Sequence, residues 1–116
     1  MLIRVDHASS TPLFEQVASS VRDLLASGSA TTGDRLPAAR ELAAALDINV
    51  HTVLHAYQLL RDEGLVELRR GRGAILTGGS TGLAELQPQV DALVAEARDQ
   101  GVGLPTLTAM ITKAYS

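Results

Sequence analysis

The chain has 116 residues, enough for one compact domain and too few for two full ones. Apolar residues make up 46% and charged residues 20%, as in ordinary globular proteins, and no apolar run approaches the roughly 18 residues that a membrane span needs. The sequence contains no Cys, which excludes disulfides, thiolate nucleophiles and zinc sites built on Cys. Residues 1–6 do not resemble a signal peptide, because a single Arg is followed by acidic and polar residues, so we expect a cytoplasmic protein with no membrane partner.

The formal net charge of −3 disfavours a nucleic-acid partner unless the positive charges are clustered. Residues 34–73 carry six basic and six acidic groups, whereas the segments on either side are net negative. Within this neutral segment, Arg69, Arg70 and Arg72 fall close together. Positive charge is therefore locally dense, and we expect a moderate, salt-sensitive affinity for DNA with little nonspecific binding.

A first helix is expected between Pro12 and Gly28. Thr11 is the expected N-cap and Pro12 the expected first helical residue, because the missing N–H of proline costs nothing there. Gly28 is a plausible stop. We interpret this helix as a support without chemistry of its own, since its apolar residues form one stripe at helical spacing, namely Phe14, Val17, Val21, Leu24 and Leu25.

The stretch from Leu36 to Leu76 is the one around which the chain is organised. A short helix is expected to begin at Leu36 and Pro37, after the polar loop that ends at Arg35. Arg40 lies off its apolar face and is interpreted as a phosphate contact, with an ion pair to a neighbouring carboxylate as the alternative. The inner face of this helix consists of Ala39, Leu42, Ala43 and Leu46.

A tight turn and a second helix follow. Residues 47–49 are expected to form the turn, with Asn49 capping the helix and Gly64 ending it. The apolar stripe of this helix is Val53, Ala56, Tyr57 and Leu60, with the Tyr57 hydroxyl expected to reach a partner from the core. The opposite side carries hydrogen-bonding and small apolar groups suited to a major groove, namely His51, Leu54, His55, Gln58 and Arg61.

A hairpin is expected after the second helix. Leu65–Leu68 and Ala74–Leu76 are short apolar-rich runs around a bend that contains Gly71 and Gly73. Arginines in an isolated turn are often merely solvated. Their place directly after a helix-turn-helix favours contacts to phosphates or to the narrow, electronegative minor groove. The three elements together predict a winged helix-turn-helix.

Residues 83–116 are expected to form a second segment after a flexible linker at 78–82, which leaves residues 1–77 for the winged domain. Apolar residues recur at helical spacing from Leu83 to Ala97, with Pro88 in the first turns, and a last helix begins at Leu104 and Pro105. Two such helices cannot bury their apolar stripes on each other alone. The two helices are therefore expected to bury these stripes against a second copy of the chain. The fold class predicted is mainly α with a small β-wing, a winged helix-turn-helix plus a C-terminal two-helix dimerisation segment.

His51 and His55 also have the four-residue spacing of a two-histidine metal site. Thr52 stands where a zinc protease has its glutamate, and no third ligand is evident, so groove contact is the preferred interpretation. The chain offers no nucleophile with a base, no cofactor fingerprint and no carboxylate dyad. We expect no enzyme activity, no catalytic residue, no cofactor and no metal.

Several motifs in fixed order resemble the DNA-binding domain of GntR-family bacterial transcription regulators. They are Leu36-Pro37-Ala38-Ala39-Arg40-Glu41-Leu42-Ala43, Thr52-Val53, Ala56-Tyr57, Glu63-Gly64-Leu65-Val66 and Arg70-Gly71-Arg72-Gly73. Pro12 to Val17, and Asn49 with His51-Thr52-Val53, are similar to the YtrA-like subgroup, and the short tail matches that subgroup in size. The resemblance implies a homodimeric repressor of an inverted-repeat operator, with wing residues in the minor groove. Base preference cannot be transferred, because Val50, Leu54 and His55 depart from the residues frequent in the family. Asp47 stands where glycine is usual in the family, and because Asp tolerates a left-handed backbone better than most residues, the turn is expected to be kept.

Combining face, wing and resemblance, we expect double-stranded DNA as the partner. The expected DNA-binding residues are Arg35, Arg40, Asn49, Val50, His51, Thr52, Leu54, His55, Arg69, Arg70, Gly71 and Arg72. The alternative is a winged-helix module that binds another protein, which the net negative charge favours. A small-molecule effector of unknown identity is left open, with its site expected where tail and winged domain meet.

Overall fold

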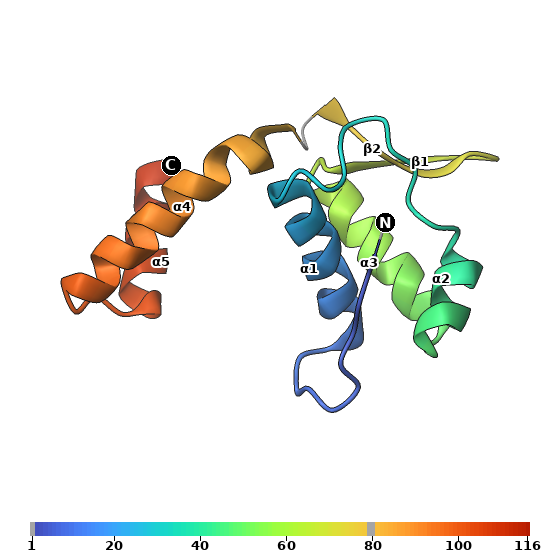
Figure 1. Ribbon diagram of the computed structural model, residues 1–116, viewed down its shortest axis with the longest axis horizontal. Helices are drawn as coiled ribbons and strands as arrows, with labels where there is room; N and C mark the ends of the chain where they lie inside the picture. The colour runs from blue at the N-terminus through green and yellow to red at the C-terminus, as the bar shows by residue number, and fades with distance from the viewer. Residues whose placement is uncertain (1, 79–80) are drawn as a thin grey trace. The chain divides into compact units, whose positions relative to one another are not determined.

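The computed structural model describes residues 2–78 and 81–116, which form five helices and one two-stranded sheet (Figure 1). The described chain divides into two compact units, Met1–Glu85 and Leu86–Ser116. The predicted class, mainly helical with a small sheet, is confirmed. In chain order the elements are α1 (Leu13–Ala26), α2 (Ala39–Leu46), α3 (Val50–Asp62), β1 (Val66–Arg69), β2 (Gly73–Leu76), α4 (Thr81–Asp99) and α5 (Leu104–Tyr115).

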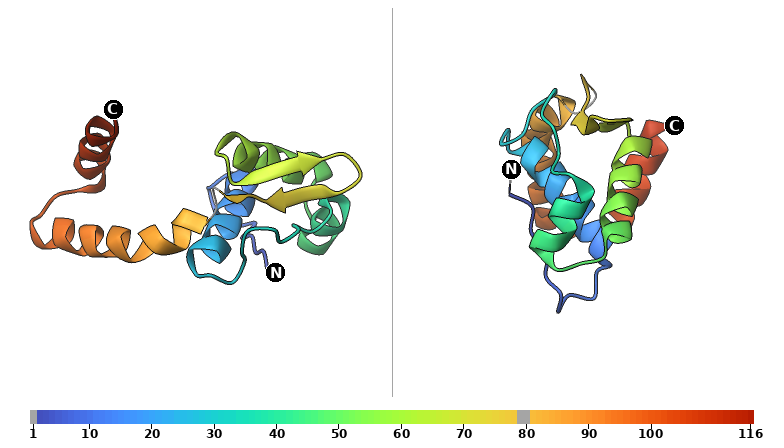
Figure 2. Two further views of the ribbon diagram at one scale, coloured as in Figure 1. Left: turned by 90° about the horizontal axis from the view of Figure 1, so that it is seen from above. Right: turned by 90° about the vertical axis from the view of Figure 1, so that its right-hand side faces the viewer.

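Helix α3 is the centre of the first unit, because it contacts α1, α2 and β1 (Figures 1 and 2). Its predicted inner stripe is buried, and Val53 and Leu60 are fully so. Val17 and Val21 of α1 meet them in one apolar cluster, as the helical spacing predicted. The core thus holds α3 from one side and leaves its other side exposed.

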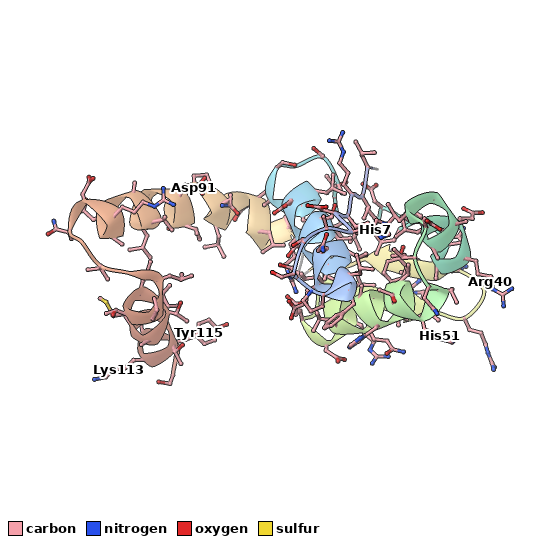
Figure 3. All side chains as sticks on the ribbon, turned by 90° about the horizontal axis from the view of Figure 1, so that it is seen from below. His7, Arg40, His51, Asp91, Lys113 and Tyr115 are labelled. Atoms are coloured by element: carbon pink, nitrogen blue, oxygen red, sulfur yellow. The ribbon has the colours of Figure 1, made fainter. Side chains whose placement is uncertain are left out.

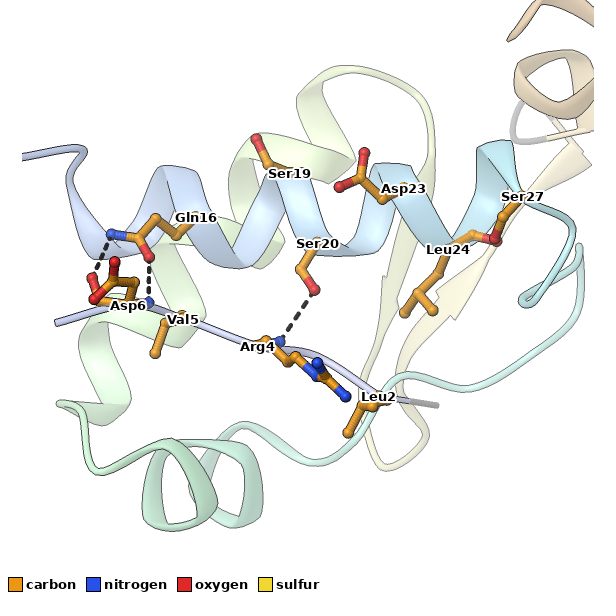
Figure 4. A pocket seen from close by; sticks show the side chains of 10 residues that line it. All are labelled: Leu2, Arg4, Val5, Asp6, Gln16, Ser19, Ser20, Asp23, Leu24 and Ser27. Carbon is orange, nitrogen blue, oxygen red and sulfur yellow. Dashed lines mark hydrogen bonds between the residues drawn. The ribbon is translucent and has the colours of Figure 1, made fainter. Parts of the chain in front are cut away.

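The N-terminal boundary of α1 differs from the prediction. The helix begins at Leu13, with Pro12 as an extended N-cap at ψ 141°, and no side chain caps it. The Gln16 side chain binds the preceding segment instead, with its Nε2 donating to the Thr11 carbonyl at 2.8 Å. Its Oε1 accepts from the Asp6 N–H at 2.6 Å, a bond drawn in Figure 4. Gln16 thus ties the preceding segment to α1, whereas the N–H groups of the first turn receive no side-chain cap.

The turn between α2 and α3 agrees with the sequence. Asp47 has φ 54° and ψ 52°, and it is the one residue other than glycine with positive φ in the described ranges 2–78 and 81–116. The Asn49 side chain accepts from the His51 N–H at 2.8 Å, as expected of an N-cap. Gly64 follows the last turn of α3 with φ 80°, so both ends of this helix are fixed by local backbone chemistry.

Strands β1 and β2 pair antiparallel from Val66 opposite Leu76 to Arg69 opposite Gly73. Leu36 does not begin a helix as predicted, because its N–H donates to the Ala74 carbonyl at 2.8 Å. Asp34 likewise accepts from the Leu76 N–H, and a bridge joins Arg35 to Ile75. The segment before α2 therefore runs along β2, and α2 starts only at Ala39.

The second unit contains α4 from Leu86 onward and all of α5. Gly101, at φ 74°, lies in the turn between them, and Gly103 is the N-cap of α5. Ala97 and Leu107 are buried, whereas large apolar side chains of both helices remain exposed. They are Leu86, Val90, Leu93, Leu104, Met110, Ile111 and Tyr115.

The predicted linker at 78–82 lies partly outside the described residues, because Gly79 and Ser80 are not among them. Thr81 and Gly82 belong to α4 rather than to a linker. The Thr81 hydroxyl donates to the Gly78 carbonyl at 3.0 Å, which supports the first turn of that helix. Within residues 2–78 and 81–116, no helix combines the length and apolar character needed to cross a bilayer.

Candidate nucleic-acid interface

The outer side of α3 presents the predicted contact residues. His51, Leu54 and His55 are exposed, as are Gln58 and Arg61 further along. Two other predicted residues, Val50 and Thr52, are only half-exposed, and Val50 packs against the core. The exposed set follows directly from burial of the opposite stripe, because residues three and four apart share a helix face.

Tyr57 fixes α3 to the segment that leads into α2. Its hydroxyl donates to the Pro37 carbonyl at 2.6 Å, and burial raises the pKa of the phenol. Tyr57 is thus a core residue whose hydroxyl has a partner, as predicted, and not a base-stacking residue. This bond sets the position of the first turn of α2, which carries the exposed side chain of Arg40.

A ring stack holds His55 in place. The Phe14 and His55 rings lie 4.0 Å apart between centroids at an interplanar angle of 18°. The two side chains line a hollow of about 450 Å³ together with Leu13, Asn49, His51 and Thr52. His55 therefore has a restricted ring orientation on the outer side of α3. Among the described residues, no group of three His, Cys, Asp or Glu could hold a metal ion.

The arginines of the interface differ in their partners. Arg69 donates to Glu67 at 3.1 Å, and this hydrogen bond and charge raise the pKa of Arg69 and lower the pKa of Glu67. Within the described part of the chain, Arg40, Arg70 and Arg72 form no ion pair, so the alternative of a structural ion pair for Arg40 finds no support. Figure 3 shows Arg40 projecting from α2 into solvent.

A further cation, Arg35, lies beside the start of β2, close to the tip of the wing. A Cβ added at Gly73 would lie 3.8 Å from Arg35 Nε, so the Arg35 guanidinium lies beside β2. Gly71 and Gly73 both have positive φ, near 78° and 76°, which lets the chain reverse within three residues. The Arg72 N–H closes this bend on the Arg69 carbonyl at 3.1 Å.

Sequence reasoning missed three residues at this surface: Phe14, Glu67 and Leu68. Phe14 belongs to another helix, so only the fold shows that it meets His55. The Glu67 pairing could have been found, because residues two apart on a strand share one face. Leu68 was assigned to the strand without regard to exposure, and it is 38% exposed.

We expect Glu67→Gln to strengthen DNA binding roughly twofold to fivefold, the range of a single exposed charge contact. The change removes the partner that occupies Arg69 and leaves the guanidinium available for a phosphate. Titration of labelled duplex DNA measures the effect. In an Arg69→Ala background the gain should vanish. A gain of equal size there would show that Glu67 acts by repelling phosphate and not through Arg69.

Helix-turn-helix proteins place the second helix of the pair in the major groove and use neighbouring cations on the phosphates. Here α2 and α3 form the pair, and the arginine-bearing hairpin follows directly after it in the chain and contacts α3 through β1. The first unit is accordingly a winged helix-turn-helix, a DNA-binding domain.

Comparison with known proteins agrees with this class. Residues 13–76 match the family of bacterial regulatory proteins called the gntR family. The chain is 37% identical over 112 residues to the HTH-type transcriptional repressor YtrA of Bacillus subtilis, covering 91% of this chain and 86% of that protein. The structure of YtrA from Sulfolobus acidocaldarius, a GntR-family transcription factor, has a TM-score of 0.62 at 30% identity, covering 85% of this chain and 99% of that one.

The fold also matches the DNA-binding domain of AraR, solved in complex with the operator ORX1. The TM-score is 0.58 at 20% identity, with 66% of this chain and 96% of that one covered. The chain belongs to the GntR family of bacterial transcription regulators, and its likeness to the YtrA-like subgroup is confirmed. It is a transcriptional regulator with a DNA-binding domain, and the relatives it matches are regulators rather than enzymes.

Proposed function

We propose that the protein is a homodimeric repressor that binds an inverted-repeat operator through α3 and the wing. The observation that carries the proposal is the exposed outer side of α3, set beside cations that have no ion-pair partner in residues 2–78 and 81–116. The name repressor given to the Bacillus subtilis relative supports the direction of regulation. Such a protein acts on chromosomal DNA, and we accordingly assign it to the cytoplasm.

We propose different DNA contacts for α3 and for the arginines, according to where each side chain lies. His51, Leu54 and His55 face outward from the first half of α3 and would read base edges in the major groove. Arg40 and the wing arginines would contact phosphates or the minor groove, which position the protein without reading sequence. Asn49 uses its side-chain oxygen for the helix cap, so its amide NH₂ is the group left to contact DNA.

The second unit supports self-association. Its 31 residues, Leu86–Ser116, leave apolar side chains on both helices exposed. Burying such surface contributes about 25 cal/mol for each Å² removed from water. A second copy of the chain is the proposed cover, because a two-fold dimer matches a two-fold operator. The proposed boundaries remain residues 1–77 for DNA binding and 83–116 for dimerisation.

Selection of bound sites from a random duplex library tests the proposal. We expect an inverted repeat whose half-sites lie about one helical turn, roughly 10 base pairs, apart. Titration of the selected duplex at several salt concentrations should show affinity falling as salt rises. Failure to enrich any motif, with and without cell extract, would contradict operator binding and favour the protein-interaction module.

We expect the double variant Arg70→Ala with Arg72→Ala to bind the selected duplex less tightly and with a shallower salt dependence. Each lost phosphate contact should reduce the slope of log affinity against log salt by about 0.9. Arg4→Ala is the control, because Arg4 is exposed and lines a hollow beside α1 to which no wing residue contributes (Figure 4). Unchanged affinity and slope in the double variant would contradict the role assigned to the wing.

A further inference from the structure

Two exposed leucines from different elements line one hollow on the DNA-binding domain. Leu54 of α3 is 40% exposed and Leu68 of β1 is 38% exposed. Both border a hollow of about 320 Å³ whose other walls include Pro37, Tyr57 and Ala74. Tyr57 and Ala74 are buried, and the Tyr57 hydroxyl is already bonded to Pro37, so the walls offer an entering group mainly apolar surface.

The hollow opens on the surface that we assign to DNA. Leu54 lies on the outer side of α3, three residues after His51 and one before His55. Arg69 and Arg70 also border the hollow, on the wing side. An anionic polymer drawn to these arginines would therefore bring its own groups past the two leucines. Small exposed apolar surfaces flanked by cations suit a nucleic acid that presents an apolar group.

Among the four bases, only one presents such a group in the major groove. Guanine, cytosine and adenine expose hydrogen-bond donors or acceptors there, whereas thymine adds a C5-methyl group beside its O4 acceptor. A leucine can neither donate nor accept. Packed against a polar base edge, a leucine would exclude water from that edge without replacing the hydrogen bonds that the water made. Set against the thymine methyl, it removes apolar surface from water on both sides.

We propose that Leu54 reads a thymine in each operator half-site by packing on its C5-methyl group, with Leu68 closing the hollow around that contact. The inference rests on the proposed function, because it names the base that one face of α3 recognises. It also explains why a base-reading surface carries an aliphatic side chain, a residue that contributes no hydrogen bond to specificity.

Replacement of thymine by deoxyuridine tests the contact, because it removes the methyl group and keeps base pairing. In the selected duplex, each thymine pair related by the operator symmetry is replaced in turn. One replacement should weaken wild-type binding by about fourfold per half-site, the effect of one buried methyl-sized group. Leu54→Ala should bind the thymine duplex more weakly and show no further loss with deoxyuridine. Leu68→Ala should show a reduced loss.

Leu2→Ala is the matched control, since Leu2 is an exposed leucine beside α1 and should keep the full deoxyuridine effect (Figure 4). An equal deoxyuridine loss in wild type and Leu54→Ala would overturn the assignment of Leu54, and an undiminished loss in Leu68→Ala would overturn that of Leu68. Sequence-specific binding of the thymine duplex that no deoxyuridine weakens overturns the methyl contact and leaves the proposed function standing. No binding to any duplex overturns both.

A methyl group at the same place on cytosine separates methyl recognition from recognition of the whole base. At the sensitive position, the thymine pair is replaced by a cytosine pair with or without a C5-methyl group. Wild type should bind the methylated form more tightly than the unmethylated one, again by about fourfold per half-site. Equal binding of the two forms would overturn recognition through the methyl group.

Discussion

The variant Leu93→Asp is expected to be a monomer that binds the operator roughly 10²–10⁴-fold more weakly than wild type, because two linked half-site contacts become one. Leu93 is 44% exposed on α4, in line with Leu86 and Val90 at spacings of seven and three residues. In a two-fold dimer each substitution occurs twice, so two carboxylates would enter the apolar interface. Burying an unpaired charge costs far more than the lost leucine contacts.

The measurement is the molar mass in solution, by sedimentation or light scattering, followed by operator titration. Ala95→Asp provides the matched control, because Ala95 is exposed two residues away on the other side of α4. It introduces the same charge into the same helix and should leave mass and affinity unchanged. Circular dichroism should show both variants folded, since neither side chain is buried. A dimeric Leu93→Asp variant with normal operator affinity would place the dimer interface elsewhere.

The parts of the fold that the sequence predicted are those governed by neighbours along the chain. The inner stripe of α3 follows from helical period. Asn49 caps the start of the helix and Gly64 ends it, through the side-chain preference of Asn and the backbone preference of Gly. The left-handed conformation of Asp47 was expected from the family resemblance, because glycine is usual at this position and Asp tolerates the same backbone. Each of these features lies within one helix or one turn.

The errors arose where distant segments compete for the same backbone groups. Leu36 looked like a helix start, but its N–H pairs with Ala74, which lies 38 positions further along the chain. Thr11 looked like a cap, but Pro12 takes the N-cap position and the Gln16 side chain binds the Asp6 main chain ten residues away. No local pattern reports such a bond, because its partner is set by the packed fold.

The candidate interface was likewise predicted only where it depends on residues of one helix. Helical period predicted which side of α3 is exposed, yet not that Phe14 would orient His55 or that Leu68 would share a hollow with Leu54. Which of the exposed side chains touch DNA, and which bases they choose, depends on a partner molecule.

Substitution of two leucines on α3 distinguishes a loss of folding stability from a loss of DNA recognition. Leu60 is fully buried in the core, whereas Leu54 is 40% exposed on the outer side of the same helix. Leu60→Ala is expected to lower the free energy of unfolding by about 2–5 kcal/mol, through lost burial and the cavity left behind. That is a large part of the roughly 5–15 kcal/mol that holds a domain folded, so operator binding should fail with folding as temperature rises.

Leu54→Ala is the matched substitution, identical in chemistry and six residues away on one helix. Its unfolding free energy should change by less than about 1 kcal/mol, because the side chain fills no closed core site. Urea denaturation of both variants, alongside operator titration at low temperature, measures the two effects separately. Comparable destabilisation by the two substitutions would show that Leu54 is part of the core, and its weaker DNA binding would then report damage to α3 instead of a lost contact.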